Sequence, residues 1–357
     1  RWLEEFKFKQ WGLPRCISDH CPILLMEDER DWGPKPFRFI NAWCLHPKFK
    51  AEVKNCWEGF QVSGWASFRL LKKLGNLKTH LKRWNCEVFD NIDEKLKKAE
   101  DELHEWDLIA EGRNLQDVEI KRRIEIRKLV WDLSKKKEWL WLQKSRRVWA
   151  ENGDKNTRFF HLMATKRQRI NLLNSVTVNG VIHDEPGMIK QAVESHFKFL
   201  FTEDWKNRPK LSGFFDSISS VDSSEVLEAE FLEDEIWEAL KDCEGNKAPG
   251  PDGFNLKCIQ KCWAIMKGEF VQLMNEFHSN GKLAQGINSS FITLIPKKED
   301  PVGLGNYRPI SLITSVYKII AKVLSRRLRK VLPKIISEVQ TAFLSGRHII
   351  DGVLIAN

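Results

Sequence analysis

Three cations lie on either side of a predicted turn in the C-terminal third of the chain. Lys297 and Lys298 follow the apolar run 291–296, and Arg308 lies near the start of a second apolar run, 307–313. Two apolar runs separated by a turn rich in glycine and proline predict a β-hairpin, and rigid strands can direct several side chains toward one spot. Lysine supplies a point charge and arginine a planar fork for phosphate oxygens, so the pattern favours binding of a triphosphate.

The two adjacent lysines cannot have the same role. Neighbouring residues of a strand point to opposite faces, so only one of Lys297 and Lys298 can face the bound group. We favour Lys297, because it follows Pro296 directly.

Four short strings near these cations resemble conserved motifs of a known family. They are Lys247-Ala-Pro-Gly-Pro-Asp-Gly253, Leu294-Ile-Pro-Lys-Lys298, Asn306-Tyr-Arg-Pro-Ile-Ser-Leu312 and Gln340-Thr-Ala-Phe-Leu-Ser-Gly-Arg347. In this order they resemble motifs in the fingers of reverse transcriptases, most of all those of plant LINE-type (non-LTR) retrotransposons. Independent chance matches multiply, so four strings in order within about a hundred residues are a specific signal.

The resemblance implies roles for individual residues. Lys297 or Lys298, together with Arg308, would contact the incoming deoxynucleoside triphosphate (dNTP). The other two strings would lie beside the template strand, which implies template contacts for Lys247, Asp252, Gln340, Phe343, Gly346 and Arg347. Taken by itself, the segment 247–253 also fits a tight connector in which Asp252 is a turn residue.

A fifth string, Ile17-Ser-Asp-His20, lies near the start of the chain. It resembles the last motif of the endonuclease/exonuclease/phosphatase fold, which implies that Asp19 orients His20 at a scissile phosphate. A carboxylate behind an imidazole fixes its tautomer and raises its basicity, so the pairing makes chemical sense. A loop Asp-His before a short buried strand at 23–25 is the alternative explanation. The remaining metal ligands and strands of that fold are expected before residue 1.

The net charge of +9 is unevenly distributed. Residues 121–170 contain sixteen Lys/Arg against five Asp/Glu, and residues 318–334 contain seven basic and no acidic residues, whereas residues 203–244 contain four Lys/Arg against thirteen Asp/Glu. Because balancing acids are few in the basic blocks, contact with a nucleic-acid backbone is favoured over a solvated helix face. The cations assigned to such contacts are Arg146, Arg147, Arg158, Lys166 and Arg167 in the first block and Arg326 and Arg327 in the second.

Tryptophans recur in the first basic block, at Trp131, Trp139, Trp141 and Trp149. Aromatic side chains on helices usually pack into a core, and we favour that interpretation for most of the four. The alternative is stacking on nucleic-acid bases beside the lysines.

The hydrophobic periodicity predicts a mainly α fold with small β elements (α+β). Residues 66–150 are predicted to be helical with a break at 112–114, residues 172–183 to form a hairpin with an Asn-Gly turn, and residues 316–331 to form a basic helix that Pro333 ends. We expect three parts: a C-terminal remnant of the nuclease domain over residues 1–27, a basic helical linker over 28–215, and the fingers of a reverse transcriptase over 216–357. The chain resembles a segment cut from a longer protein.

Several classes of protein and site are disfavoured. No apolar run approaches the ~20 residues of a membrane span, so no membrane association is expected. The eight cysteines are scattered, and Cys258 and Cys262 lack a second Cys/His pair, so neither a zinc site nor a disulfide framework is expected. The expected location is nuclear or cytoplasmic, with RNA template, DNA and dNTP as partners and no obligate protein partner.

Catalysis is a separate question. A reverse transcriptase needs two palm aspartates to hold two Mg²⁺ ions, and this sequence contains no Asp-Asp pair. We therefore expect the chain alone to bind no cofactor and to be inactive, with Mg²⁺ needed by the full-length protein. Two alternatives remain: a non-catalytic nucleic-acid-binding module, and the product of a degraded element.

Overall fold

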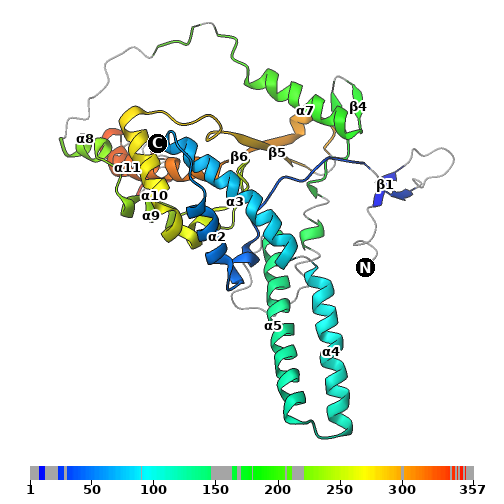
Figure 1. Ribbon diagram of the computed structural model, residues 1–357. Coiled ribbons are helices and arrows are strands. Elements are labelled where there is room, and N and C mark those ends of the chain that lie inside the picture. The colour runs from blue at the N-terminus through cyan, green and yellow to red at the C-terminus, as the bar shows by residue number, and fades with distance from the viewer. Residues whose placement is uncertain are drawn as a thin grey trace, which may run out of the picture. The chain divides into compact units, whose positions relative to one another are not determined.

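The computed structural model describes residues 8–12, 23–27, 30–89, 91–145, 163–166, 170–178, 180–205, 207–210, 221–298, 301–337, 340–341, 344, 346–348 and 350. The chain forms two compact units. The first comprises residues 1–35, 171–209 and 294–308, and the second comprises residues 36–170, 210–293 and 309–357. The described residues are mainly helical and include three two-stranded sheets, which confirms the predicted fold class (Figure 1).

The first unit is built on short strands and one helix. Strands β1 (Phe8–Gly12) and β2 (Ile23–Glu27) pair antiparallel, as do β3 (Val176–Val178) and β4 (Val181–His183). Gly180 provides the left-handed conformation of the β3–β4 turn, with φ of 80°. Helix α7 (Pro186–Phe201) and the 3₁₀ turn η3 (Leu304–Asn306) complete a small core of Val176, Ile189 and Leu304.

The second unit contains most of the helices. They are η1 (Asn41–Leu45), α2 (Phe49–Gly59), α3 (Ala66–Val88), α4 (Ile92–Gly112), α5 (Asp117–Ser145), α8 (Val221–Glu228), α9 (Glu233–Lys241), α10 (Leu256–Asn280) and α11 (Ser315–Ile335). One continuous core joins the apolar faces of α2, α3, α10 and α11, with Leu70, Leu77, Phe270 and Val316 almost fully buried. The apolar stripe of α3 at helical spacing is therefore a core face.

Helices α4 and α5 form a long antiparallel pair (Figure 1). Ion pairs join them along their length: Arg122–Glu102 at 2.9 Å, Arg123–Asp107 at 2.6 Å and Lys137–Asp93 at 2.7 Å. Such exposed pairs each contribute only about 0–1 kcal/mol, so they set the register of the pair more than its stability.

The tryptophans of α5 have different environments. Trp139 packs against the main core, as predicted for a helical core residue. Trp131, in contrast, is 59% exposed. Helix α5 carries apolar residues on more than one side, and only the side with Ile126 and Leu133 is buried.

The strands β5 (Ser290–Pro296) and β6 (Tyr307–Ile313) pair with each other, and the chain passes between the two units along both of them. Helix α11 follows β6 directly, and the Thr314 hydroxyl accepts a hydrogen bond from the Tyr317 amide at its start. The predicted helix end at Pro333 is wrong by two residues, because Pro333 lies inside the last turn. Among the described residues, no helix combines the length and apolar content that crossing a membrane requires.

Candidate functional site

The three cations of the first unit lie at the distal end of the β5–β6 hairpin. Lys297 and Lys298 follow β5 directly, Arg308 is the second residue of β6, and all three side chains are exposed. The Lys297 amide donates to the Asn306 carbonyl at 2.8 Å, and the Lys297 amine donates to the Gly305 carbonyl at 2.8 Å. The backbone of the turn therefore holds the Lys297 amine in place.

No acidic side chain in the described part of the chain pairs with Lys298 or Arg308. The described residues do not compensate these two charges, and two of the five guanidinium N–H groups of an arginine suffice to grip a phosphate oxygen pair. The hairpin can thus present an anion site made of one fixed amine and two exposed cations.

The loop Lys247–Gly253 belongs to the second unit, and its glycines are required by close packing. A Cβ at Gly250 would overlap the Ile313 carbonyl, and a Cβ at Gly253 would lie 2.6 Å from the Phe37 carbonyl oxygen. Gly253 also has a φ of 79°, a conformation that favours glycine. The loop is thereby held tightly against the end of β6 and the segment 37–39.

Asp252 faces into the protein and caps helix α11. Its carboxylate accepts hydrogen bonds from the Ser315 amide at 2.6 Å and from the Ser315 hydroxyl. A carboxylate at this place satisfies an unpaired donor and interacts favourably with the helix dipole. Burial nevertheless raises the pKa of Asp252 above its usual value. The structure thus places Asp252 as the turn residue of a tight connector, and the exposed cation of this loop is Lys247.

Lys318 supports the same loop from α11. Its amine donates to the Ala248 carbonyl at 3.0 Å, and burial lowers its pKa although the nearby Asp252 opposes that change. A cavity of about 240 Å³ lies beside the loop, lined among others by Arg38, Gly250, Thr293 and Leu312. Sequence reasoning assigned residues 36–38 to a linker and missed this exposed arginine at the edge of the cavity.

Arg327 corrects the predicted orientation of α11, where it was expected on the outer face. It is 4% exposed, its guanidinium binds both oxygens of Glu235 at 2.7 Å, and Phe231 lies 4.0 Å below it. It also donates to three backbone carbonyls at the end of α8 and just after it, those of Leu227, Ala229 and Glu230.

The periodicity of α11 contained the signal for this placement. Position 327 continues the series Val316, Ile320, Val323 and Val331, all of which are buried. The assignment of Arg327 to nucleic-acid contact followed its charge and not its place in this series. A buried arginine is possible here because α9 supplies the opposite charge.

Arg326 is partly exposed and pairs with Asp242 and Glu238. The exposed cations of α11 that have no acidic partner among the described residues are Arg329, Lys330 and Lys334. They are better placed for a polyanion than either of the two arginines singled out from the sequence.

The last motif is only partly described. Arg347 donates to the carbonyls of Pro333, Ile336, Ser337 and Gln340, at 2.6 to 3.2 Å, and so caps the C-terminal end of α11. Gln340 is exposed, and Gly346 has a φ of 83°. Lys166 is exposed in the short helical turn 163–166. The other predicted site residues lie outside the described residues: Asp19, His20, Arg146, Arg147, Arg158, Arg167 and Phe343.

In the described ranges, no three His, Cys, Asp or Glu side chains converge in a way that could hold a metal ion. Cys258 and Cys262 are buried in α10 near Cys44, and burial is the main reason that the pKa of the Cys44 thiol rises to about 12. Thiols with raised pKa values stay protonated and are poor nucleophiles.

Comparison with known proteins gives two relatives, and no family model matches. The chain is 25% identical over 363 residues to the transposon TX1 uncharacterized 149 kDa protein of Xenopus laevis, covering 95% of this chain and 26% of that protein. It is 23% identical over 168 residues to the retrovirus-related Pol polyprotein from type-1 retrotransposable element R1 of Bradysia coprophila, covering 43% of this chain and 16% of that protein. The chain therefore spans about a quarter or less of each relative, and both relatives are proteins of transposable elements, in agreement with the resemblance of its motifs to non-LTR retrotransposon proteins.

Proposed function

We propose that this chain is the part of a non-LTR retrotransposon reverse transcriptase that binds the template and the incoming dNTP. In this proposal residues 216–357 belong to the fingers, residues 28–215 form a basic linker, and residues 1–27 are the end of an endonuclease domain. The observation that carries it is the β5–β6 hairpin, where Lys297, Lys298 and Arg308 are exposed with no acidic partner described for Lys298 or Arg308. The order of the four motifs and the similarity to two proteins of transposable elements support it.

In the proposed complex the hairpin binds the triphosphate of the dNTP. Arg308 would bind two phosphate oxygens with its planar fork, and the Lys297 amine, held by the Gly305 carbonyl, would supply a fixed point charge. A site whose cations are already positioned loses less side-chain entropy when an anion binds.

The template would be bound through its backbone, by exposed cations that have no acidic partner on the same helix face. Among the described residues, Arg329 and Lys330 on α11 are exposed in this way, and Lys247 in the loop is exposed with Glu244 3.5 Å away. Contacts with phosphates carry no information about base sequence, so the binding would tolerate any template.

Reverse transcription also uses Mg²⁺, and the described residues do not provide a site for it. They contain no cluster of carboxylates that could hold a metal ion, and the whole sequence contains no Asp-Asp pair. We therefore assign binding to this chain and derive no catalytic step for it. The exposed cations equally fit a non-catalytic nucleic-acid-binding module, which is the second candidate function.

Titration with a fluorescent dNTP tests the hairpin assignment. We expect Arg308→Ala to weaken dNTP binding about 10- to 100-fold, because a charge-assisted hydrogen bond contributes about 1.5–3 kcal/mol. Lys282→Ala is a matched control, because it removes one exposed cation from the end of α10. Equal affinities of wild type and Arg308→Ala would contradict the assignment.

Binding of single-stranded RNA at several salt concentrations separates the two candidate functions when it is combined with the dNTP titration. Both candidates predict an affinity that falls with salt, because bound phosphates release counterions. Only the reverse-transcriptase assignment also predicts dNTP binding that depends on Arg308. Primer extension on an RNA template with Mg²⁺ should give no product, and template-directed synthesis by this chain would overturn the binding-only role.

A further inference from the structure

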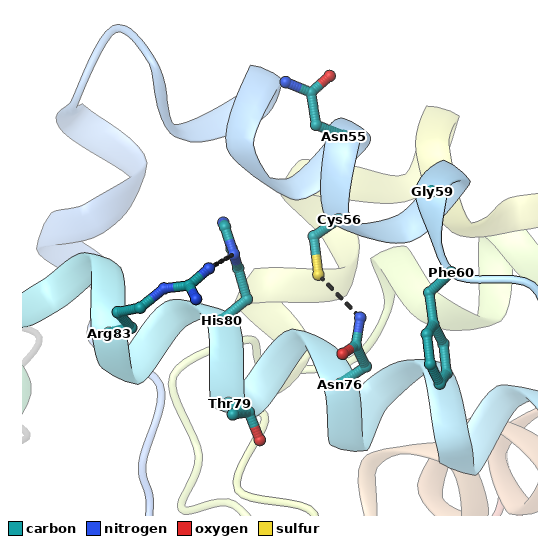
Figure 2. Close-up of a pocket in the computed structure, with 8 residues that line it drawn as sticks. All are labelled: Asn55, Cys56, Gly59, Phe60, Asn76, Thr79, His80 and Arg83. Carbon is teal, nitrogen blue, oxygen red and sulfur yellow. Dashed lines mark hydrogen bonds between the residues drawn. The ribbon is translucent and has the colours of Figure 1, made fainter.

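A polar groove of about 360 Å³ lies between α2 and α3, outside the motifs that resemble retrotransposon proteins (Figure 2). Asn76, His80 and Arg83 line it from α3 at spacings of four and three residues, which places them on one face of the helix. Figure 2 shows Arg83 and Phe60 toward opposite ends of the groove, with His80 and Asn76 between them.

His80 positions the arginine. Its Nε2 lies 3.1 Å from the Glu52 carboxylate, and its Nδ1 lies 3.4 Å from an Arg83 nitrogen. A carboxylate can only accept and a guanidinium can only donate, so the neutral imidazole carries its proton on Nε2 and accepts from Arg83 at Nδ1. This chain of contacts fixes the Arg83 side chain while using one of its five N–H groups.

The rest of the groove leaves space for a ligand. The Asn76 amide donates to the Cys56 sulfur at 3.3 Å, so its carbonyl oxygen is available as an acceptor. A Cβ added at Gly59 would meet no atom within 4 Å, which keeps this side of the groove open. The half-buried Phe60 ring follows at the end of α2.

The charge of α3 favours an anion. The helix contains six Lys/Arg and one acidic residue, Glu87. Lys73 and Arg69 are paired with Glu269, whereas no acidic side chain among the described residues pairs with Arg83. Glu52 opposes an anion, but its carboxylate is already engaged by His80.

We propose that the α2–α3 groove binds one nucleotide unit, with its phosphate on Arg83 and its base against Phe60. A guanidinium fork matches a phosphate, an aromatic ring stacks on any base, and the groove volume lies at the lower end of the range of about 300–1,000 Å³ for ligand pockets. The choice of a nucleotide over another phosphorylated ring rests on the proposed function. The unit is either a free nucleoside monophosphate or one nucleotide of an RNA strand.

Cys56 provides a direct readout of occupancy. Its thiol lines the groove, whereas Cys86 of the same helix pair is exposed and serves as an internal reference. Burial raises the pKa of Cys56, so alkylation is measured in mildly alkaline buffer by mass spectrometry of both peptides. We expect uridine monophosphate to slow alkylation of Cys56 and to leave Cys86 unchanged.

Variants separate binding from folding. Arg83→Gln should require about 10- to 100-fold more uridine monophosphate for the same protection, because it removes a charge-assisted contact. Gly59→Leu should fill the groove and abolish the calorimetric heat of nucleotide binding, while Gly75→Leu, an exposed helical glycine outside the groove, should behave as wild type. Protection that is unchanged in Arg83→Gln, or binding that survives Gly59→Leu, would overturn the proposal.

The choice of probe identifies the ligand. Equal protection by inorganic phosphate would overturn the base contact with Phe60. If uridine monophosphate protects Cys56 and hexauridylate does not, the ligand is a free nucleotide. If only hexauridylate protects it, the ligand is an RNA strand. If neither probe protects Cys56, the proposed site is wrong. If the chain binds RNA in the salt titration while Cys56 stays unprotected by either probe, the groove proposal fails and the proposed function stands. If uridine monophosphate protects Cys56 in a chain that binds neither RNA nor dNTP, the groove proposal stands and the proposed function fails.

Discussion

Arg327 allows the sharpest test of how α11 is used. Its side chain is 5% exposed, and it connects α11 to Glu235 and to three carbonyls at the junction of α8 and α9. If these contacts describe its role, Arg327→Met should destabilise the second unit. If Arg327 instead contacts nucleic acid, the same change should weaken RNA binding and leave stability nearly unchanged.

The structure sets the size of the expected effect. Methionine fills a similar volume but leaves Glu235 without its partner and three carbonyls without a donor. Removing one member of a buried ion pair costs about 3–5 kcal/mol, because the remaining charge stays desolvated. The matched control is Arg326→Met, whose side chain is 32% exposed and pairs with Glu238 and Asp242 at the surface, where a loss of about 0–1 kcal/mol is expected.

Urea unfolding monitored by circular dichroism measures both variants. We expect a lower midpoint for Arg327→Met with an unchanged slope, together with a salt dependence of RNA affinity equal to that of the wild type in native buffer. A loss of stability below about 1 kcal/mol, or the same loss in both variants, would falsify the burial argument.

Three further predictions concern the loop, its glycine and the outer face of α11. Because the folded pKa of Asp252 is raised, the folded state binds its proton more tightly than the unfolded state does. The free energy of unfolding of the wild type, measured relative to that of Asp252→Asn, should therefore fall as pH rises from about 3.8 through the folded pKa. A difference between the two proteins that stays constant with pH would contradict this. Gly250→Ala should lower the free energy of unfolding by at least about 1–3 kcal/mol, because the added methyl group overlaps the Ile313 carbonyl. Gly268→Ala in α10, where a Cβ meets no atom within 4 Å, should raise it by about 1 kcal/mol, and thermal unfolding measures both. Arg329→Gln should reduce the salt slope of RNA binding by about 0.7 without changing the unfolding midpoint, and an unchanged slope would remove it from the interface.

Local sequence patterns were sufficient to predict the two strands of the hairpin and the long helices. Two apolar runs and the turn residues between them predicted the β5–β6 hairpin, and a 3.6-residue period predicted α11 within a few residues of its ends. Both signals come from residues that are close together in the sequence. The Lys297 and Arg308 assignments stay predictions, which the dNTP titration tests.

The role of Arg327 and the capping of α11 by Asp252 could not be obtained in this way. Arg327 and Glu235 are 92 positions apart, and Asp252 and Ser315 are 63 apart. A charged residue in an apolar series could mark an outer face or a buried pair, and only the partner across the interface decides which. Trp131 shows the converse, since an aromatic residue at helical spacing is 59% exposed.

The sequence by itself determined the mainly helical fold, the hairpin with its three cations and the resemblance to retrotransposon proteins. These features depend on periodicity and motifs formed by residues that are close together in the sequence. Only the tertiary structure decided which cations remain available. Packing brings acids from α9 onto Arg326 and Arg327 and leaves Arg329, Lys330 and the hairpin cations exposed. It also forms the α2–α3 groove from two helices whose separate patterns indicate only an apolar core, because a concave site exists only where two elements meet.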